Sequence, residues 1–161
     1  MNSLDLCRQL REREMPKFVK VLKAIPDGKR DYKPDPKSRT ALELAWLLAM
    51  SEGALVSLLD TGTVDWKDTK APTDLAPILA AFEKNSSAVD ERLKKLDEAG
   101  WAKKGKFLFG EGAGWEDTYE QFVWGFLCDS IHHRGQLTTY LRAMGGKVPS
   151  IYGPSADDAG Q

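Results

Sequence analysis

The chain has 161 residues, of which 42% are hydrophobic and 29% are charged, and its formal net charge is −1 at pH 7. This length fits one domain with its own core, and the composition excludes the low hydrophobicity and high charge of disordered chains. Although the stretch 29–37 is basic, the near-neutral total gives no overall positive field for phosphates, so nucleic acid is not an expected partner.

Two helices are predicted in the first sixty residues. Apolar residues recur at helical spacing over 3–25, and Pro16 within this stretch predicts a kink or a division into two helices. A proline-rich connection follows, and the Thr40–Glu43 capping box predicts the start of a second helix that runs to about Leu59. Apolar residues almost surround this second helix, which indicates burial on several sides.

Two further helices are predicted in the rest of the chain. The third is capped by Thr73 or Asp74 and ends near 99–100, and its apolar residues alternate steps of three and four. The glycine-rich stretch 100–114 predicts either a loop or a brief extended segment lying on the bundle. An acidic capping arrangement at 117–120 begins the last helix, which continues to Met144. We therefore expect an all-α, antiparallel four-helix bundle that forms one domain over 1–161.

One face of the last helix is aromatic at both ends and polar in the middle: Tyr119, Phe122, Phe126, Asp129, His133, Gln136 and Tyr140. Burying a carboxylate and an imidazole is costly unless they pair or bind a metal. Asp129 and His133 are one turn apart, so one can orient the other or both can bind one cation. The alternative is a buried hydrogen-bonded pair with a structural role only. His132 shares another face with Cys128, where spacing alone permits a second metal pair.

The cysteines and the apolar runs indicate the compartment. Cys7 and Cys128 are the two cysteines, and their wide separation favours free thiols in a reducing environment. The N-terminus carries charged residues, and we find no uninterrupted apolar run of the roughly 18 residues that span a membrane. We expect a cytoplasmic protein without a membrane partner.

The sequence resembles the DinB family over nearly its whole length. His132-His133-Arg134-Gly135-Gln136-Leu137 and the segments after it resemble the C-terminal half of DinB proteins, and 31–38 and 42–52 resemble the N-terminal half. The resemblance implies a four-helix bundle with a divalent metal, zinc or nickel, held by three histidines. Here His133 matches one ligand, Asp129 takes the place of its partner, and Leu47 stands where the second-helix histidine belongs. A metal would therefore need another ligand, for which Glu52 is the candidate.

Two functions of different class are then possible, the first implied by the resemblance and the second favoured by its departure at Leu47. The first is a metal-dependent small-molecule transferase, which attaches thiols such as bacillithiol or mycothiol to electrophiles, or a hydrolase, with an impaired three-histidine site. In this function His133, oriented by Asp129, can also act as a general base without metal. The second is a non-catalytic homodimeric bundle that binds a ligand or a partner.

Further residues have predicted roles outside the Asp129 and His133 pair. These are Trp46, Trp115 and Trp124 for a cavity wall or core, Arg134 and Gln136 for substrate contact, and 148–155 for a strap on the bundle.

Overall fold

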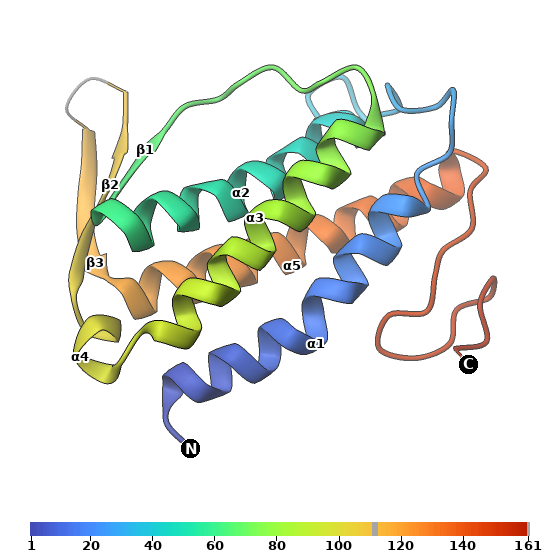
Figure 1. Cartoon of the computed structure of the whole chain (residues 1–161). Coiled ribbons are helices and arrows are strands. Elements are labelled where there is room, and N and C mark those ends of the chain that lie inside the picture. The colour runs from blue at the N-terminus through green and yellow to red at the C-terminus, as the bar shows by residue number, and fades with distance from the viewer. Residues whose placement is uncertain (111–112, 161) are drawn as a thin grey trace.

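Four long helices form most of the chain in the computed structural model, which describes residues 1–110 and 113–160. They are α1 (Ser3–Lys23), α2 (Ala41–Thr61), α3 (Leu75–Lys95) and α5 (Tyr119–Ala143) (Figure 1). A one-turn helix and three strands complete the described elements: α4 (Glu98–Trp101), β1 (Thr63–Trp66), β2 (Lys104–Phe109) and β3 (Ala113–Thr118).

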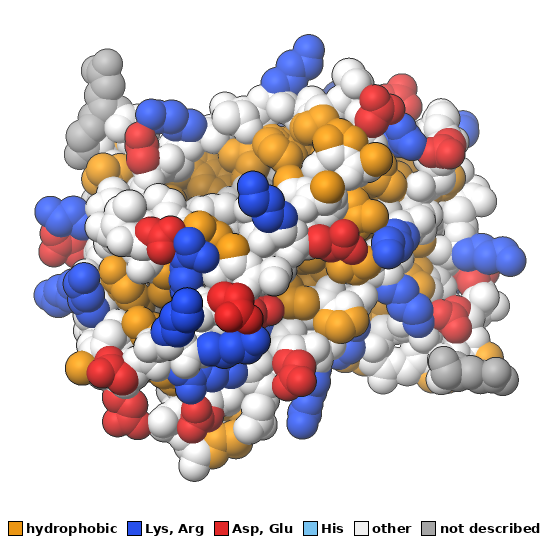
Figure 2. Space-filling view, in the orientation of Figure 1, with side chains coloured by type: hydrophobic (Ala, Val, Ile, Leu, Met, Phe, Trp, Pro, Cys, Tyr) orange, Lys and Arg blue, Asp and Glu red, His pale blue; other side chains and the backbone are white. Residues whose placement is uncertain are grey.

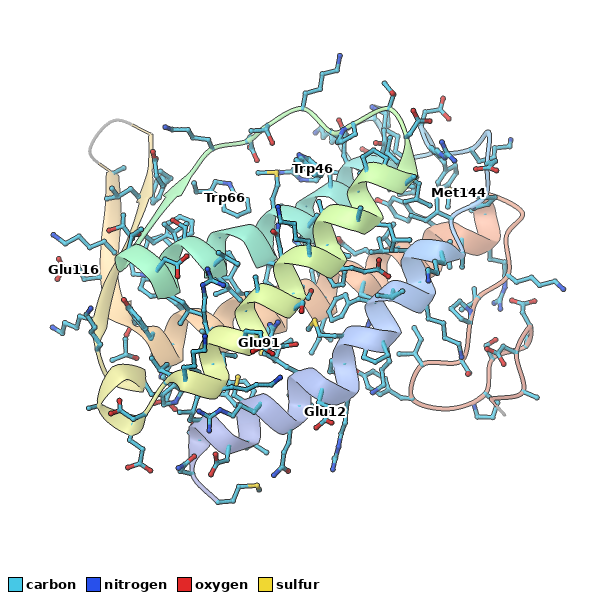
Figure 3. All side chains as sticks on the ribbon, in the orientation of Figure 1. Glu12, Trp46, Trp66, Glu91, Glu116 and Met144 are labelled. Atoms are coloured by element: carbon cyan, nitrogen blue, oxygen red, sulfur yellow. The ribbon has the colours of Figure 1, made fainter. Side chains whose placement is uncertain are left out.

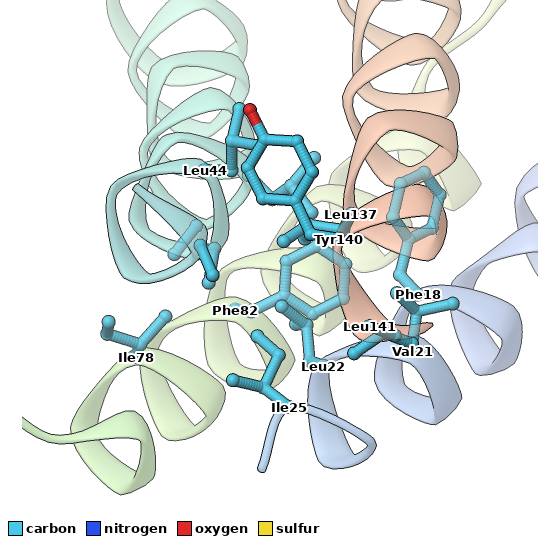
Figure 4. Packing of buried hydrophobic residues seen from close by; sticks show 14 of the residues in the cluster. Phe18, Val21, Leu22, Ile25, Leu44, Ile78, Phe82, Leu137, Tyr140 and Leu141 are labelled. Carbon is cyan, nitrogen blue, oxygen red and sulfur yellow. The ribbon is translucent and has the colours of Figure 1, made fainter. Parts of the chain in front are cut away.

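The order of the helices differs from the alternating pattern that we expected. One hydrophobic cluster joins Ile25 at the end of α1 with Ala41 and Ile78 at the starts of α2 and α3, and with Tyr140 near the end of α5 (Figure 4). A second cluster joins the opposite ends of the same helices. Thus α1 and α5 run one way and α2 and α3 run the other, because the segment 67–74 returns along the bundle before α3 begins (Figure 1).

A small sheet corrects the all-α prediction. β1 pairs in parallel with β2, and β2 pairs antiparallel with β3, so that Phe107 lies opposite Trp115. Within the glycine-rich stretch, residues 104–109 and 113–114 are therefore extended, one of the two alternatives that the sequence left open. Gly105 is required here, since a Cβ at this position would approach Leu58 Cδ1 to 2.6 Å. The missing side chain lets β2 lie against the end of α2.

Of the two alternatives predicted at Pro16, a division into two helices is wrong, because α1 continues through Pro16 as one helix. Two helix ends differ in detail from the sequence predictions. α3 stops at Lys95, because Leu96 is extended, and the expected end near 99–100 falls in the separate helix α4. The cap of α5 is Thr118, whose Oγ1 accepts a hydrogen bond from Gln121 N at 3.1 Å. The predicted Thr40–Glu43 capping box on α2 is confirmed, with both of its hydrogen bonds present.

α2 packs against α3, α5 and β1. By length and composition it could cross a membrane, but half of its apolar window is buried by other parts of the chain. It also carries Glu52, which is buried and bound to Arg11 of α1 at 2.7 Å. These features are those of a core helix in a soluble domain.

Candidate functional site

A cavity of about 480 Å³ lies between α2, α5 and the sheet. It brings together Leu47 of α2 with Asp129 and His133 of α5, three positions that the sequence analysis associated with one site. Its described lining consists of Arg39, Leu47, Ser51, Trp66, Phe107, Trp115, Asp117, Gln121, Phe122, Gly125, Phe126, Asp129 and His133.

His133 is held at the cavity wall by contacts at both ring nitrogens. Its Nδ1 lies 2.8 Å from Gln136 Oε1, and its Nε2 lies 3.3 Å from Asp129 Oδ2. The Nδ1–H tautomer donates to Gln136 Oε1, and the Nε2–H tautomer directs its N–H toward Asp129, so the neighbouring side chains orient the ring in either form. The histidine side chain is 18% exposed and remains accessible.

Asp129 does not face the bundle interior as expected. Its side chain is 57% exposed at the edge of the cavity. The buried polar residues of α5 are instead Ser130 and Arg134, each one position further along the helix. Neighbouring residues of a helix are rotated by about 100° about its axis. The predicted polar and aromatic face of α5 therefore lies on the cavity side of the buried face and not at its centre.

The described residues do not form the expected metal centre. Both oxygens of Glu52 contact the guanidinium of Arg11, at 3.2 and 2.7 Å, and Glu52 is not part of the cavity lining. Leu47 contributes hydrocarbon. Over residues 1–110 and 113–160 no three histidine, cysteine, aspartate or glutamate side chains converge. Asp129 and His133 supply two donors, whereas catalytic zinc uses three protein ligands.

Stacked aromatic side chains form one wall of the cavity. Phe107 lies at their centre, with its ring centroid 4.5 Å from that of Trp115 and 6.2 Å from that of Trp66. Phe122 and Phe126 of α5 extend the wall, at 6.4 and 6.0 Å from Phe107. Trp115 was one of the predicted wall residues, but Trp66 and Phe107 were missed. Their adjacency depends on the pairing of β1 with β2, which no local pattern in the sequence reveals.

A second cavity of about 350 Å³ adjoins the first and shares Arg39 and Leu47 with it. The segment 67–73 covers this second cavity, and Trp46 Nε1 donates a hydrogen bond to Thr69 Oγ1 at 2.9 Å. Figure 3 places Trp46 and Trp66 between α2 and this segment. Figure 2, in the orientation of Figure 1, shows hydrophobic side chains at the surface along the upper part of the molecule.

Arg134, a predicted substrate contact, is buried and has other partners. Its Nη1 donates to Glu14 Oε2 at 2.6 Å, and its Nη2 donates to Tyr152 Oη at 2.6 Å. The guanidinium also lies over the ring of Phe18, 4.5 Å from its centroid. These contacts fix the C-terminal tail against the bundle, which confirms the predicted strap.

The two thiols lie outside the described cavity lining. Cys7 is buried, and this burial raises the pKa of its thiol to about 11. Cys128 and His132 are both exposed on α5, away from the cavity. A nucleophilic thiol would therefore have to arrive with a ligand.

Comparison with known proteins resolves the family. The DinB family profile matches residues 2–160. The chain belongs to the DinB family. This result confirms the resemblance noted from 132–137 and the segments around it.

Solved structures of DinB-like proteins share the fold. A DinB-like protein from Bacillus cereus ATCC 10987 has a TM-score of 0.72 and 24% identity, over 89% of this chain and 94% of that one. The DinB-like protein YjoA from Bacillus subtilis has a TM-score of 0.69 and 19% identity, over 95% and 98%. A mycothiol-dependent maleylpyruvate isomerase has a TM-score of 0.53 and 11% identity, over 89% and 61%. Comparison with curated proteins finds no significant sequence match.

Proposed function

We propose that this DinB-family protein is a small-molecule transferase in which His133 acts as a general base on a thiol. The observation that carries the proposal is the position of His133 in the lining of the aromatic cavity. Gln136 fixes the ring through Nδ1 at 2.8 Å, and Asp129 lies 3.3 Å from Nε2. In the tautomer that donates from Nδ1 to Gln136, Nε2 is the free nitrogen that a general base requires.

The reaction follows from these contacts. An incoming thiol gives its proton to His133 Nε2, and Asp129 stabilises the imidazolium. The thiolate forms a carbon–sulfur bond with an electrophile on the aromatic wall, and the leaving group departs with the electron pair of the broken bond. His133 returns its proton to the leaving group.

Metal-dependent thiol transfer, which the family resemblance implied, is not part of the proposal. Zinc or nickel would find Asp129 and His133 on one side of the cavity and the hydrocarbon of Leu47 on the other. Neither Glu52 nor a described cysteine supplies a third donor there. If water replaces the thiol, the same base gives a hydrolase, which the assay below distinguishes by its product.

The test is the turnover of 1-chloro-2,4-dinitrobenzene with cysteine, bacillithiol or mycothiol, in the presence of EDTA. His133→Ala should lower the rate above buffer by roughly 100-fold, the usual contribution of a general base. His132→Ala is the matched control, because it removes an adjacent imidazole that is exposed outside the cavity. Equal losses in the two variants, or a wild-type rate equal to that of buffer with every thiol, would contradict the proposal.

The second candidate is a non-catalytic homodimer that binds a ligand or a partner. Leu47 favours it, because this residue removes a metal ligand, and Leu108, Phe109 and Trp115 add exposed apolar surface on the β2–β3 hairpin. In this case sedimentation should give a dimer, and His133→Ala should change neither the ligand affinity nor the assembly.

A further inference from the structure

One cationic side chain of the cavity has no role in the reaction above. Arg39 directly precedes the Thr40 cap of α2, and it is the only lysine or arginine in the described lining of the aromatic cavity. It also lines the adjoining second cavity. A guanidinium provides a planar, bidentate match for a carboxylate.

Arg39 is held more loosely than the other arginines that form ion pairs in the described part of the chain. Its Nη2 lies 3.7 Å from Asp68 Oδ1, and the two side chains are 48% and 69% exposed. By contrast, Arg11 and Arg134 contact carboxylates at 2.7 and 2.6 Å. Exposed pairs of the first kind contribute little free energy. A ligand carboxylate can therefore replace Asp68 at small cost.

The position of Arg39 complements the aromatic wall. Tyr140 Oη donates a hydrogen bond to the backbone oxygen of Arg39 at 3.3 Å, which places Arg39 beside the last turns of α5. Phe122 and Phe126 lie in the first turns of the same helix, and His133 lies between the two ends. A molecule that spans the cavity from the wall to Arg39 thus passes His133.

We propose that Arg39 binds a carboxylate of the substrate, whose aromatic or apolar body lies on the wall formed by Phe107 and its neighbours. The substrate class is then an aromatic or apolar carboxylic acid, and the proposal rests on the proposed function for the identity of this site. Arg39 supplies a positive charge to this cavity, in which Leu47 stands where the family resemblance implies a histidine ligand of a metal.

The acidic residues of the cavity set the orientation of such a ligand. Asp117 is at the end of β3, beside the aromatic wall, and its Oδ1 accepts a hydrogen bond from Thr118 N at 2.8 Å. Asp129 lies 3.3 Å from His133 Nε2. Both repel a carboxylate from the wall end, so the reversed orientation is disfavoured.

The test is calorimetric titration with naphthalene-2-carboxylate and with its neutral carboxamide, in EDTA. The wild type should bind the carboxylate about tenfold more tightly than the carboxamide, and Arg39→Gln should remove this difference without changing carboxamide affinity. Arg39→Lys should restore part of it. Arg142→Gln is the control, since Arg142 is also exposed but binds Asp157 outside the cavity.

Three results would overturn the role of Arg39. They are equal affinity of the wild type for both probes, equal losses in Arg39→Gln and Arg142→Gln, and carboxylate binding that appears only after zinc is added. Absence of binding by both probes would overturn the cavity as a ligand site as well. The thiol assay depends on His133, so a failure there with charge selectivity intact would contradict the reaction and leave the role of Arg39 standing.

Discussion

Leu47 determines which chemistry the cavity can support. It is 7% exposed, and it lines the same cavity as Asp129 and His133. Leu47→His should create a three-donor site and raise the zinc content from near zero to about one ion per chain, because catalytic zinc sites use three protein ligands. Metal analysis after dialysis against zinc, on protein without a histidine tag, measures this change.

The control for this substitution removes the donor from the opposite helix. Leu47→His combined with His133→Ala should lose the gained zinc, and thermal unfolding followed by circular dichroism should show that both variants remain folded. If the wild type already binds one zinc ion and His133→Ala removes it, the two-donor interpretation is wrong. If Leu47→His gains no metal while folding normally, the geometry of the pair does not suit zinc.

At the level of single residues, the sequence identified part of the site and missed its other components. The i, i+4 spacing was sufficient to associate Asp129 with His133, since both lie on one helix. Arg39 precedes α2 and Trp66 ends β1, so their approach to α5 depends on how α2 and the sheet pack against that helix. Glu52 was misplaced because its partner, Arg11, is 41 residues away in the chain.

At the level of elements, helix positions were more predictable than the sheet. The Thr40–Glu43 capping box is local, and its pattern fixes the start of α2 without reference to the rest of the molecule. Residues 104–109 and 113–118 are extended because β2 pairs with β1 on one side and with β3 on the other. Strand pairing across 40 or more residues leaves no periodic signal in the short, glycine-rich segment.

The C-terminal strap, residues 148–155, is held by a hydrogen-bond network around the buried carboxylate of Glu14. Tyr152 Oη donates to Glu14 Oε2 at 2.8 Å, and Lys17 and Arg134 donate to the same carboxylate. Burial alone would raise the pKa of the Glu14 carboxyl, but these three hydrogen bonds outweigh it and lower that pKa. The network therefore stabilises the fold above the ordinary glutamate pKa of about 4.3, and this contribution is lost as the pH falls through the lower folded value.

Tyr152→Phe should reduce the free energy of unfolding at pH 7 by about 1 kcal/mol, because it removes one donor to a charged acceptor. The difference from the wild type should shrink once Glu14 is protonated, at pH values below its lowered pKa. Urea unfolding at pH 7 and in acid measures both values. Tyr32→Phe changes a tyrosine outside this network and should show no such pH dependence. If Tyr152→Phe lowers the free energy of unfolding equally at both pH values, the contribution of Tyr152 does not depend on the charge of Glu14.

At the level of the whole molecule, a polar layer divides the bundle between its two hydrophobic clusters. Arg11 of α1, Glu52 of α2, Ser86 of α3 and Ser130 of α5 are all buried near mid-height of their helices. These four residues lie at the same height along the bundle, although α1 and α5 run one way and α2 and α3 run the other. At this level Arg11 of α1 forms ion pairs with Glu52 of α2 and Asp90 of α3, and we expect these pairs to oppose axial sliding of the three helices, since sliding would separate the charges.

The Arg11–Glu52 pair tests whether this layer contributes specificity more than stability. Arg11→Met leaves a buried carboxylate without its partner, so it should lower the free energy of unfolding by about 3–5 kcal/mol. Arg11→Met with Glu52→Leu removes both charges, and it should recover most of that loss because hydrocarbon then fills the layer. Urea unfolding of the single and double variants gives the coupling energy. Additive losses would mean that the two charges act independently, and Asp90, 2.7 Å from Arg11 Nε, would then be the partner that matters.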